Sequence, residues 1–282
     1  MKRSVRSKGI YYAYNVTNNI SNDISLAEVK KTHCQPNYEI LHIIKGSGRF
    51  IIDGREYPIK PHTMFLLAPF EYQHIEFDEE CAVYERQILF FQLDDLTEEG
   101  KKIFQTMSEN KKGMELFYPP EAVTQKMLFN LGRYNELFDL PEMQRNAYAQ
   151  LLLTELIVYT SMTRIDELRQ LNINLAAQVV DYINQNIGNN FSLDELSKRF
   201  FVSKYYLCRA FKKHNGISVH GYINQKRIIY AKHLIDSGES ASTAAYKVGF
   251  GDYSAFYRAY VKFLGTSPTS NAENKEFMYE NS

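Results

Sequence analysis

The 282-residue sequence has few cysteines and no long apolar run. Its three cysteines, Cys34, Cys81 and Cys208, lie far apart in the chain. An odd and scattered set fits neither a disulfide framework nor a zinc knuckle. The most apolar window, Leu151 to Met162, is interrupted by Glu155 and is shorter than the roughly 20 residues that a membrane-spanning helix needs. We therefore expect reduced cysteines and no membrane partner.

The beginning of the chain also lacks the pattern of an export signal. Met1 to Gly9 is basic, but the residues that follow, Tyr11 to Asn19, are polar and aromatic. A secretion machinery recognises an apolar segment at this place. We expect a cytoplasmic protein, which agrees with the cysteine usage.

Net charge is absent as well, because 33 Lys and Arg balance 33 Asp and Glu. The balance hides an asymmetry: residues 1–170 carry 20 basic against 24 acidic residues, whereas residues 171–270 carry 12 against 6. A basic excess of this size also arises by chance in some soluble domains. It nevertheless predicts a polyanionic partner for the back part alone. The length suggests two domains, at about 150 residues for each.

The front part has the pattern of an antiparallel β-domain. Short runs rich in β-branched and aromatic residues are separated by turn signals, and they cover Tyr38 to Lys45, Arg49 to Ile52, Thr63 to Leu67 and Val83 to Gln92. Asp53-Gly54 lies between two such runs. This pair favours a tight hairpin because both positions need positive φ. The pattern predicts a small barrel or sandwich.

Helical periodicity replaces the strand pattern after Leu96. The expected helices cover Thr97 to Asn110, Pro120 to Phe138 and Pro141 to Thr163. In the last of them, one apolar stripe is formed by Leu152, Leu156 and Tyr159 and is widened by Leu153 and Ile157. That stripe either covers the barrel or pairs with its copy in a second subunit.

The back part is nearly all helical and contains an internal duplication. At an offset of 49 residues, Ser203 aligns with Asp252, Leu207 with Phe256, Arg209 with Arg258 and Gly216 with Gly265. Each unit is a short helix, a turn and a second helix, and Ser192 with Glu195 forms a capping box at the first of them. A longer helix, about Val219 to Ser237, joins the units. The pattern predicts two helix-turn-helix units.

The second helix of each unit has an apolar stripe and an opposite, outward stripe. A major groove admits an α-helix, and arginine can form two parallel hydrogen bonds with guanine. We predict base contacts from Tyr205, Cys208, Arg209, Tyr253, Ser254, Tyr257 and Arg258. We predict phosphate contacts from Lys204, Lys212, Lys213 and Lys262, with Lys198, Lys226 and Arg227 as further cations. Any one such lysine is more often a solvated surface residue, so the prediction rests on the set.

The joining helix agrees with this interpretation. About 19 residues at 1.5 Å each span roughly 28 Å, and successive major-groove faces of DNA lie about 34 Å apart. A rigid helix of that length can hold two recognition helices in adjacent grooves on one side of the duplex.

The run Ser192 to Pro268 resembles the DNA-binding domain of the AraC/XylS family of bacterial regulators. The resemblance lies in Ser203 to Lys213, in Val248-Gly249-Phe250, and in Arg258 to Pro268. It implies seven helices, two helix-turn-helix units and base contacts from the outward positions named above. One departure is visible, because this chain has Ala241, Ala244 and Ala245 where that family usually has large aliphatic residues. We expect a thinner core in the second unit.

The front part is similar to the cupin-like sensor barrel that is often fused to such domains. The similarity lies in Gly46 to Phe50, Asp53 to Tyr57, and Pro69 followed by His74. Cupin enzymes bind metal through a His-x-His pair, which this chain lacks, so we predict no metal site and no cofactor. A sensor needs convergent polar groups in a cavity, and we predict His33, Glu39, His42 and Arg86 as ligand-binding residues. Tyr11, Tyr12 and Tyr14 belong either to an arm that closes over the ligand or to a short edge strand.

We therefore predict an α+β chain of two domains. Residues 1–163 form a cupin-like barrel followed by helices that senses a ligand and dimerises, 164–174 a linker, 175–270 an all-helical domain with two helix-turn-helix units, and 271–282 a polar tail. The predicted function is a sequence-specific transcription regulator of the AraC type and not an enzyme. Its expected partners are promoter DNA, RNA polymerase, a small effector such as a sugar, and a second copy of the chain. The alternatives are a cupin-type metalloenzyme with an accessory helical domain and a constitutive DNA-binding protein whose barrel only dimerises.

Overall fold

The computed structural model describes residues 2–18, 20, 30, 32–109, 116–117, 121–162, 174–189 and 192–269. The chain folds as two compact units, one drawn from residues 1–171 and the other mainly from residues 172–282. Each unit is considered by itself below. The predicted linker lies outside the described residues apart from Asn174, and the predicted tail lies wholly outside them. The predicted domain bounds therefore stay predictions.

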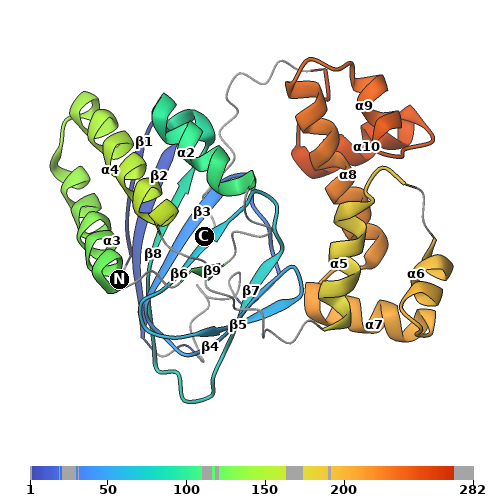
Figure 1. Ribbon diagram of the computed structural model, residues 1–282, viewed down its shortest axis with the longest axis horizontal. Coiled ribbons are helices and arrows are strands. Elements are labelled where there is room, and N and C mark those ends of the chain that lie inside the picture. Colours follow the sequence, from blue (N-terminus) through green and yellow to red (C-terminus); the bar gives the residue numbers. More distant parts are fainter. Residues whose placement is uncertain are drawn as a thin grey trace. The chain divides into compact units, whose positions relative to one another are not determined.

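Two β-sheets form the body of the first unit (Figure 1). The larger sheet has the strand order β1-β2-β8-β3-β6-β9 and the smaller one the order β5-β4-β7. The strands are β1 (Lys2–Ser7), β2 (Ile10–Asn18), β3 (Tyr38–Lys45), β4 (Gly48–Ile52), β5 (Arg55–Ile59), β6 (Thr63–Leu67), β7 (Gln73–Phe77), β8 (Val83–Phe91) and β9 (Leu116–Phe117). Neighbouring strands of the larger sheet run antiparallel. The predicted all-β beginning of the chain is confirmed.

The agreement with the sequence is closest at the strands bounded by turn residues. β3 and β6 have the predicted bounds, and β4 and β8 differ from prediction by one residue each. Asp53 and Gly54 have φ values of 44° and 81°, as the predicted hairpin turn requires. β5 contains Pro58, which the sequence placed between elements. It lies at the edge of its sheet, where a proline without an N–H is tolerated.

Strand β2 corrects both expectations for the N-terminal tyrosines. It lies between β1 and β8, with Tyr12 opposite Leu89. The Tyr12 side chain is fully buried, and its ring stacks on Tyr134 with 5.1 Å between centroids. These residues form neither an arm over a ligand nor an edge strand. Their partners on β8 are more than 70 residues away in the chain, so local patterns gave no indication of this pairing.

Three helices cover the larger sheet (Figure 1). They are α2 (Glu98–Glu109), α3 (Glu121–Arg133) and α4 (Glu142–Met162). The 3-10 turn η2 (Leu93–Asp95) precedes α2, and η3 (Tyr134–Asp139) lies between α3 and α4. The three predicted helical segments are thus confirmed, although the second one ends in a 3-10 turn. A single apolar core joins Ile40, Leu66 and Leu89 of the sheet to Phe104 and Leu131 of the helices.

The apolar stripe of α4 belongs to that core. Leu152, Leu153, Leu156 and Ile157 are all fully buried within one chain. Tyr159 is half-buried, and its hydroxyl donates to Glu155 Oε1 at 2.7 Å. The stripe therefore covers the sheet, and the alternative that it pairs two subunits is wrong, because these side chains are already withdrawn from the surface. Each one contributes about 1.5–3 kcal/mol through burial.

The second unit is all-helical. Its helices are α5 (Leu175–Gln185), α6 (Leu193–Arg199), α7 (Lys204–Asn215), α8 (Val219–Asp236), α9 (Ala241–Lys247) and α10 (Tyr253–Leu264). The seventh helix that the family resemblance implies does not occur in residues 174–189 and 192–269. None of the helices in the described ranges combines the length and the apolarity that crossing a bilayer requires. The predicted fold class, with two helix-turn-helix units at the back, is confirmed.

Aromatic rings compensate for the small residues of α9. Ala244 and Ala245 are fully buried, and α9 packs on α10 and α8. On α10, the Phe256 ring lies 5.4 Å from those of Tyr260 and Phe250, measured between centroids. Small side chains let α9 approach closely while the rings of α10 fill the space. The expected thinning thus concerns α9 and not the core as a whole.

We predict that Leu156→Ala lowers the free energy of unfolding of the first unit by about 2–5 kcal/mol, because it leaves a cavity under α4. Met162→Ala is the control, since Met162 lies on the same helix but is 55% exposed, and it should change stability by less than about 0.5 kcal/mol. Urea denaturation followed by circular dichroism measures both. Equal effects of the two substitutions would contradict the placement of the stripe.

Candidate nucleic-acid interface and effector site

Capping residues fix both ends of the first helix-turn-helix unit. The Ser192 hydroxyl accepts the Glu195 N–H at 3.2 Å, and the Glu195 carboxylate accepts the Ser192 N–H at 2.6 Å, which is the predicted capping box. Ser203 caps α7 by accepting the Tyr206 N–H at 3.2 Å. Gly216, with φ of 69°, ends α7 in the left-handed conformation. The bounds of the predicted recognition helix thus follow from local chemistry.

The second helix-turn-helix unit repeats this arrangement with one change. Ser240 caps α9, and the Asp252 carboxylate caps α10 by accepting the N–H groups of Ser254 and Ala255 at 3.2 and 2.8 Å. Gly265 ends α10 with φ of 69°. The recognition helices α7 and α10 start 49 residues apart, whereas α6 and α9 start 48 apart. The turn of the second helix-turn-helix unit is therefore one residue longer than the turn of the first helix-turn-helix unit.

The outward stripes of α7 and α10 are exposed, as the sequence predicts. Tyr205 is 75% exposed, and Arg209, Ser254, Tyr257 and Arg258 are exposed too. Cys208 and Tyr253 are half-buried, and the Tyr253 ring lies against Phe256. In the described part of the chain, neither Arg209 nor Arg258 forms an ion pair or a side-chain hydrogen bond. Both guanidinium groups are therefore available to an acceptor outside the protein.

Lysines surround these stripes. Lys212, Lys213 and Lys262 are exposed, and so is Lys198 on α6. Lys204 is exposed as well, with its Nζ 2.5 Å from Asp194 Oδ1. A surface pair of this kind contributes only about 0–1 kcal/mol, so a phosphate can replace the carboxylate. Lys226, on α8, has a side chain that is only 15% exposed, so the phosphate contact expected of it is not supported.

Arg227 has a different place from the one that the sequence suggested. Its Nε donates to the Ile187 carbonyl at 3.2 Å, Nη1 to Gly249 at 2.9 Å and Nη2 to Asn189 at 2.8 Å. Burial lowers the pKa of this guanidinium. Arg227 therefore has a structural role and not the phosphate contact that the sequence suggested. It attaches the chain after α5 and the turn of the second helix-turn-helix unit to α8. Sequence reasoning missed it because the acceptors are backbone carbonyls.

The turn of the first helix-turn-helix unit contains an aromatic residue in a strained backbone conformation. Phe201 has φ of 53° and is 95% exposed. Its counterpart in the second helix-turn-helix unit, 48 residues later, is Gly249, with φ of 87°. A Cβ on Gly249 would lie 2.8 Å from Arg227 Nη2, so the second turn needs glycine for space as well as for conformation. The first turn bears the conformational cost of a large residue in the left-handed region.

Three of the four predicted ligand-binding residues come together in the first unit. Glu39 is buried and accepts hydrogen bonds from Gln73, at 2.8 Å, and from Gln35. Burial raises the pKa of Glu39, whereas the Gln73 hydrogen bond and the charges of His33 and Arg86 lower it. The guanidinium of Arg86 lies 5.2 Å from the Tyr84 ring centroid. Glu39, His33 and Arg86 therefore form one polar cluster.

Two buried polar atoms, one in this cluster and one beside it, have no hydrogen-bond partner among the described residues. Arg86 Nε and Asn15 Oδ1 are buried, and neither has a hydrogen-bond partner in the described residues. The two residues are cross-strand neighbours on β8 and β2, so their side chains share one face of the sheet. An unpaired buried group is costly. A ligand that bonds to both residues would remove that cost.

His42 lies apart from this cluster. It is three residues from Glu39 on β3, so its side chain points to the opposite face of the strand. Its Nδ1 lies 2.8 Å from Gln87 Oε1, and Gln87 Nε2 donates to Tyr12 Oη and to the Leu131 carbonyl at 2.9 and 3.2 Å. Burial lowers the pKa of His42 to about 4. His42 is thus a neutral, hydrogen-bonded residue between the sheet and α3, as is common for a buried histidine.

The part of the chain that the structure describes contains no group of three or more His, Cys, Asp and Glu residues placed to hold a metal ion. His62, the nearest histidine to His42, stacks on it with 5.6 Å between ring centroids. His74 Nδ1 lies 3.3 Å from Thr32 Oγ1. The histidines of the first unit are thus paired or dispersed.

Two protein-family models match the chain. Residues 25–115 match the AraC-like ligand binding domain, and residues 196–273 match a helix-turn-helix domain. The first match covers β3 to β8 with the Glu39 and Arg86 cluster. The second begins within α6 and covers the rest of the first helix-turn-helix unit and all of the second.

Known proteins resemble the chain in part or over most of its length. The transcriptional regulatory protein HptR of Staphylococcus aureus is 35% identical over 92 residues, which are 33% of this chain and 36% of HptR, so the match spans about a third of that relative. The Msm operon regulatory protein of Streptococcus mutans is 22% identical over 247 residues, 83% of each chain. Among solved structures, ToxT from Vibrio cholerae is 13% identical with a TM-score of 0.34, covering 93% of this chain and 96% of ToxT.

We predict that Phe201→Gly raises the free energy of unfolding of the all-helical part of the chain by about 0.5–1 kcal/mol. The substitution relieves the left-handed strain of about 1–2 kcal/mol and loses part of this gain to the greater freedom of glycine in the unfolded chain. Phe201→Ala is the control, because it removes the ring and keeps the Cβ. Denaturant unfolding of the full chain measures both. A loss of stability in the glycine variant would contradict the assigned strain.

Proposed function

Because the chain is a member of the AraC type of transcription regulators, with a ligand-binding domain before a helix-turn-helix DNA-binding domain, we propose that it reads promoter DNA through α7 and α10. The observation that carries this proposal is the pair of exposed stripes, each with an arginine that has no ion-pair or hydrogen-bond partner among the described residues. Base contacts come from Tyr205, Cys208 and Arg209 on α7 and from Tyr253, Ser254, Tyr257 and Arg258 on α10. Arginine can recognise guanine through two parallel hydrogen bonds.

The joining helix supports adjacent-groove binding. α8 has 18 residues, which span about 27 Å at 1.5 Å per residue. Side chains at its ends extend this span toward the spacing of about 34 Å between successive major-groove faces. Lys204, Lys212, Lys213 and Lys262 then contact phosphates, which supplies affinity that depends on salt and not on sequence.

The effector site of this proposal is the cluster of His33, Glu39 and Arg86. A guanidinium and a carboxylate offer donors and acceptors together, and the Tyr84 ring beside Arg86 offers an apolar surface. Such a mixed wall suits a small molecule with several hydroxyl groups, for example a sugar. The unpaired atoms of Arg86 and Asn15 favour a bound ligand in the same place. His42 is not included in the site.

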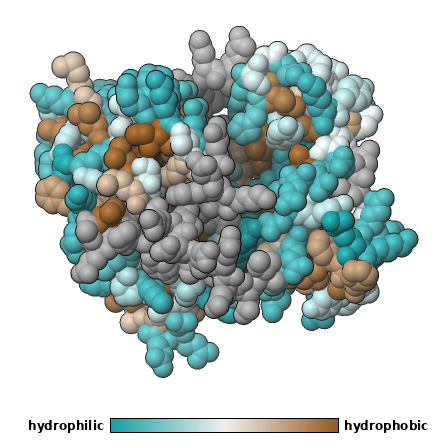
Figure 2. All heavy atoms as spheres, viewed as in Figure 1, coloured by the Kyte–Doolittle hydropathy of each residue, from teal (hydrophilic) through white to brown (hydrophobic). Residues whose placement is uncertain are grey.

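The homodimer of this proposal uses the outer face of α3 and α4. Phe129 and Leu151 are 70% and 61% exposed, and Arg133 joins the two helices by its ion pair with Glu155 at 2.9 Å. Figure 2 shows brown side chains among teal ones where these helices lie. Exposed apolar surface rimmed by charges is typical of protein contacts. A dimer presents four helix-turn-helix units, so simultaneous binding raises affinity.

The site of action is the cytoplasm, where the regulator meets promoter DNA and RNA polymerase. The two alternatives from the sequence, a metalloenzyme and a constitutive DNA-binding protein, are not favoured, because the family models assign a regulator domain to each half of the chain.

We predict that base and phosphate contacts separate in binding assays. Arg209→Ala or Arg258→Ala should weaken binding to the cognate site by about 1–3 kcal/mol and relax sequence preference, whereas Lys212→Ala should weaken binding to all sequences and flatten the salt dependence. Fluorescence anisotropy with cognate and random duplexes at several salt concentrations measures this. An equal loss on both duplexes for Arg209→Ala would remove α7 from base recognition.

We predict that a sugar stabilises the wild-type chain and changes its DNA affinity. At 100 times its dissociation constant the ligand should add about 2.7 kcal/mol of stability, and the coupling to DNA should be about 1–3 kcal/mol. Arg86→Gln should abolish both effects. Arg49→Gln is the matched control, since Arg49 is an exposed arginine of the same unit. DNA affinity that does not respond to any stabilising ligand would favour the constitutive alternative.

A further inference from the structure

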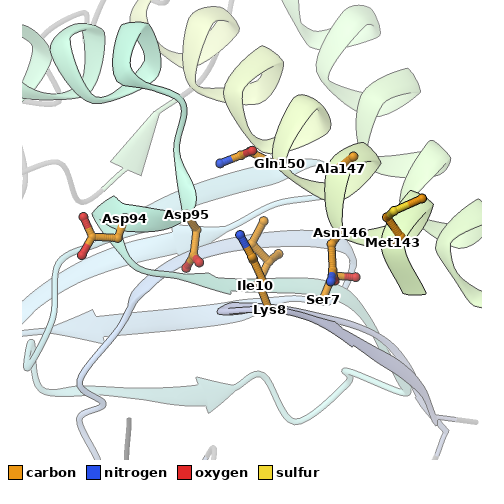
Figure 3. A pocket seen from close by; sticks show the side chains of 9 residues that line it. All are labelled: Ser7, Lys8, Ile10, Asp94, Asp95, Met143, Asn146, Ala147 and Gln150. Atoms are coloured by element: carbon orange, nitrogen blue, oxygen red, sulfur yellow. The ribbon is translucent and has the colours of Figure 1, made fainter. Parts of the chain in front are cut away.

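We propose that the first unit has a second ligand site, separate from the Glu39 and Arg86 cluster, for a small neutral molecule rich in hydroxyl groups. The site is a pocket of about 330 Å³ between the β1–β2 turn, η2 and the first half of α4 (Figure 3). Its volume is at the lower end of the usual range for small-molecule sites, about 300–1,000 Å³. Nothing in the proposed DNA-binding or barrel-sensing role uses these residues.

The walls of the pocket are held in place without a ligand. Asp95 Oδ2 accepts the Gln92 N–H at 2.7 Å, which fixes the carboxylate on η2. A Cβ on Gly9 would lie 2.2 Å from Asp95 Oδ1, so glycine is required for the carboxylate to lie against the turn. Ser7 and Ile10 form the last pair of the hairpin. The pocket is therefore preformed.

Polar side chains from all three segments converge on this space. Ser7 is 3% exposed, and its buried hydroxyl has no hydrogen-bond partner in the described residues. Asn146 and Gln150 lie one turn apart on α4, hence on one face, and neither amide bonds to another described residue. Figure 3 shows Gln150 reaching out from α4 on the side where Asp95 lies, whereas Asp94 points away. Asp94 is instead paired with Lys101 at 3.2 Å.

The chemistry of these groups selects hydroxyl groups. A serine hydroxyl and two carboxamides each donate and accept hydrogen bonds, and the carboxylate of Asp95 accepts them. A hydroxyl group of a ligand can satisfy either role. Ile10 and Ala147 add aliphatic surface for the C–H faces of such a molecule.

The charges around the pocket favour a neutral ligand. Burial raises the pKa of Asp95, and the Gln92 N–H and the positive charge of Lys8 lower it in turn. The carboxylate therefore already has a cationic neighbour in the same wall. An anionic ligand would meet the carboxylate of Asp95 at the pocket, which disfavours it.

Met143 allows a direct test on the full chain, because it lines the pocket and is largely exposed. The methionine methyl groups are labelled with carbon-13, the Met143 signal is assigned with Met143→Leu, and D-glucose, D-galactose and myo-inositol are titrated one by one. We expect a saturable shift of the Met143 signal with at least one of these probes. Ser7→Ala and Gln150→Leu should each weaken that binding up to about tenfold through the loss of a hydrogen bond.

Two controls separate this site from the rest of the molecule. Gln144→Leu changes an exposed residue of α4 outside the pocket and should leave the titration unchanged. Arg86→Gln should also leave it unchanged while abolishing the sugar response of DNA binding, so failure of either proposal is recognised by itself. Circular dichroism verifies folding of each variant.

Three results would overturn the proposal. The first is the absence of a saturable Met143 shift with all three probes, and the second is an undiminished shift in both Ser7→Ala and Gln150→Leu. The third is a response to spermidine alone, which would assign the pocket to a cationic ligand class.

Discussion

The all-helical part of the chain depends on the Arg227 guanidinium, which forms hydrogen bonds to three backbone carbonyls at 2.8–3.2 Å. Two of these carbonyls, from Ile187 and Asn189, follow α5, and the third belongs to Gly249 in the turn of the second helix-turn-helix unit. A regulator that reads two grooves needs a constant spacing between its recognition helices. Because Arg227 lies on α8, which joins the two helix-turn-helix units, its bonds hold the chain after α5 and the turn before α10 on this one helix. A shorter lysine with one point of charge could not hold all three carbonyls.

Local chemistry explains which parts of the fold could be predicted from the sequence. Helix ends at Ser192, Ser203, Asp252 and Gly265 were predictable because a cap and its N–H partners are neighbours in the chain. Long-range pairing was not predictable in this way. The place of β2 inside the sheet depends on β8, some 70 residues later. The apolar stripe of α4 predicted that this face of the helix is buried. Its period is the same whether a sheet or a second subunit covers it.

The candidate effector site shows the same limit at the level of single side chains. Residue types in the sequence were sufficient to select Glu39, Arg86 and His33, which the structure brings together. They were not sufficient to exclude His42, because the choice requires knowing the face of β3. A separation of three residues along a strand places Glu39 and His42 on opposite faces. The partner Asn15 was missed, since it becomes a neighbour of Arg86 only through the β2–β8 register.

The two faces of α4 suggest how a ligand in the first unit can influence DNA binding. Leu152 and Leu156 fix one face of the helix on the sheet, while Leu151 belongs to the proposed subunit contact. Gln150, which reaches over the pocket, is the neighbour of Leu151 in the chain. A ligand shifts an equilibrium only if it binds one arrangement better than another. A molecule that bonds α4 to η2 and to the β1–β2 turn favours the α4 positions that keep those bonds. The same bonds would therefore bias the proposed surface for a second chain, and with it the arrangement of four helix-turn-helix units in the proposed dimer.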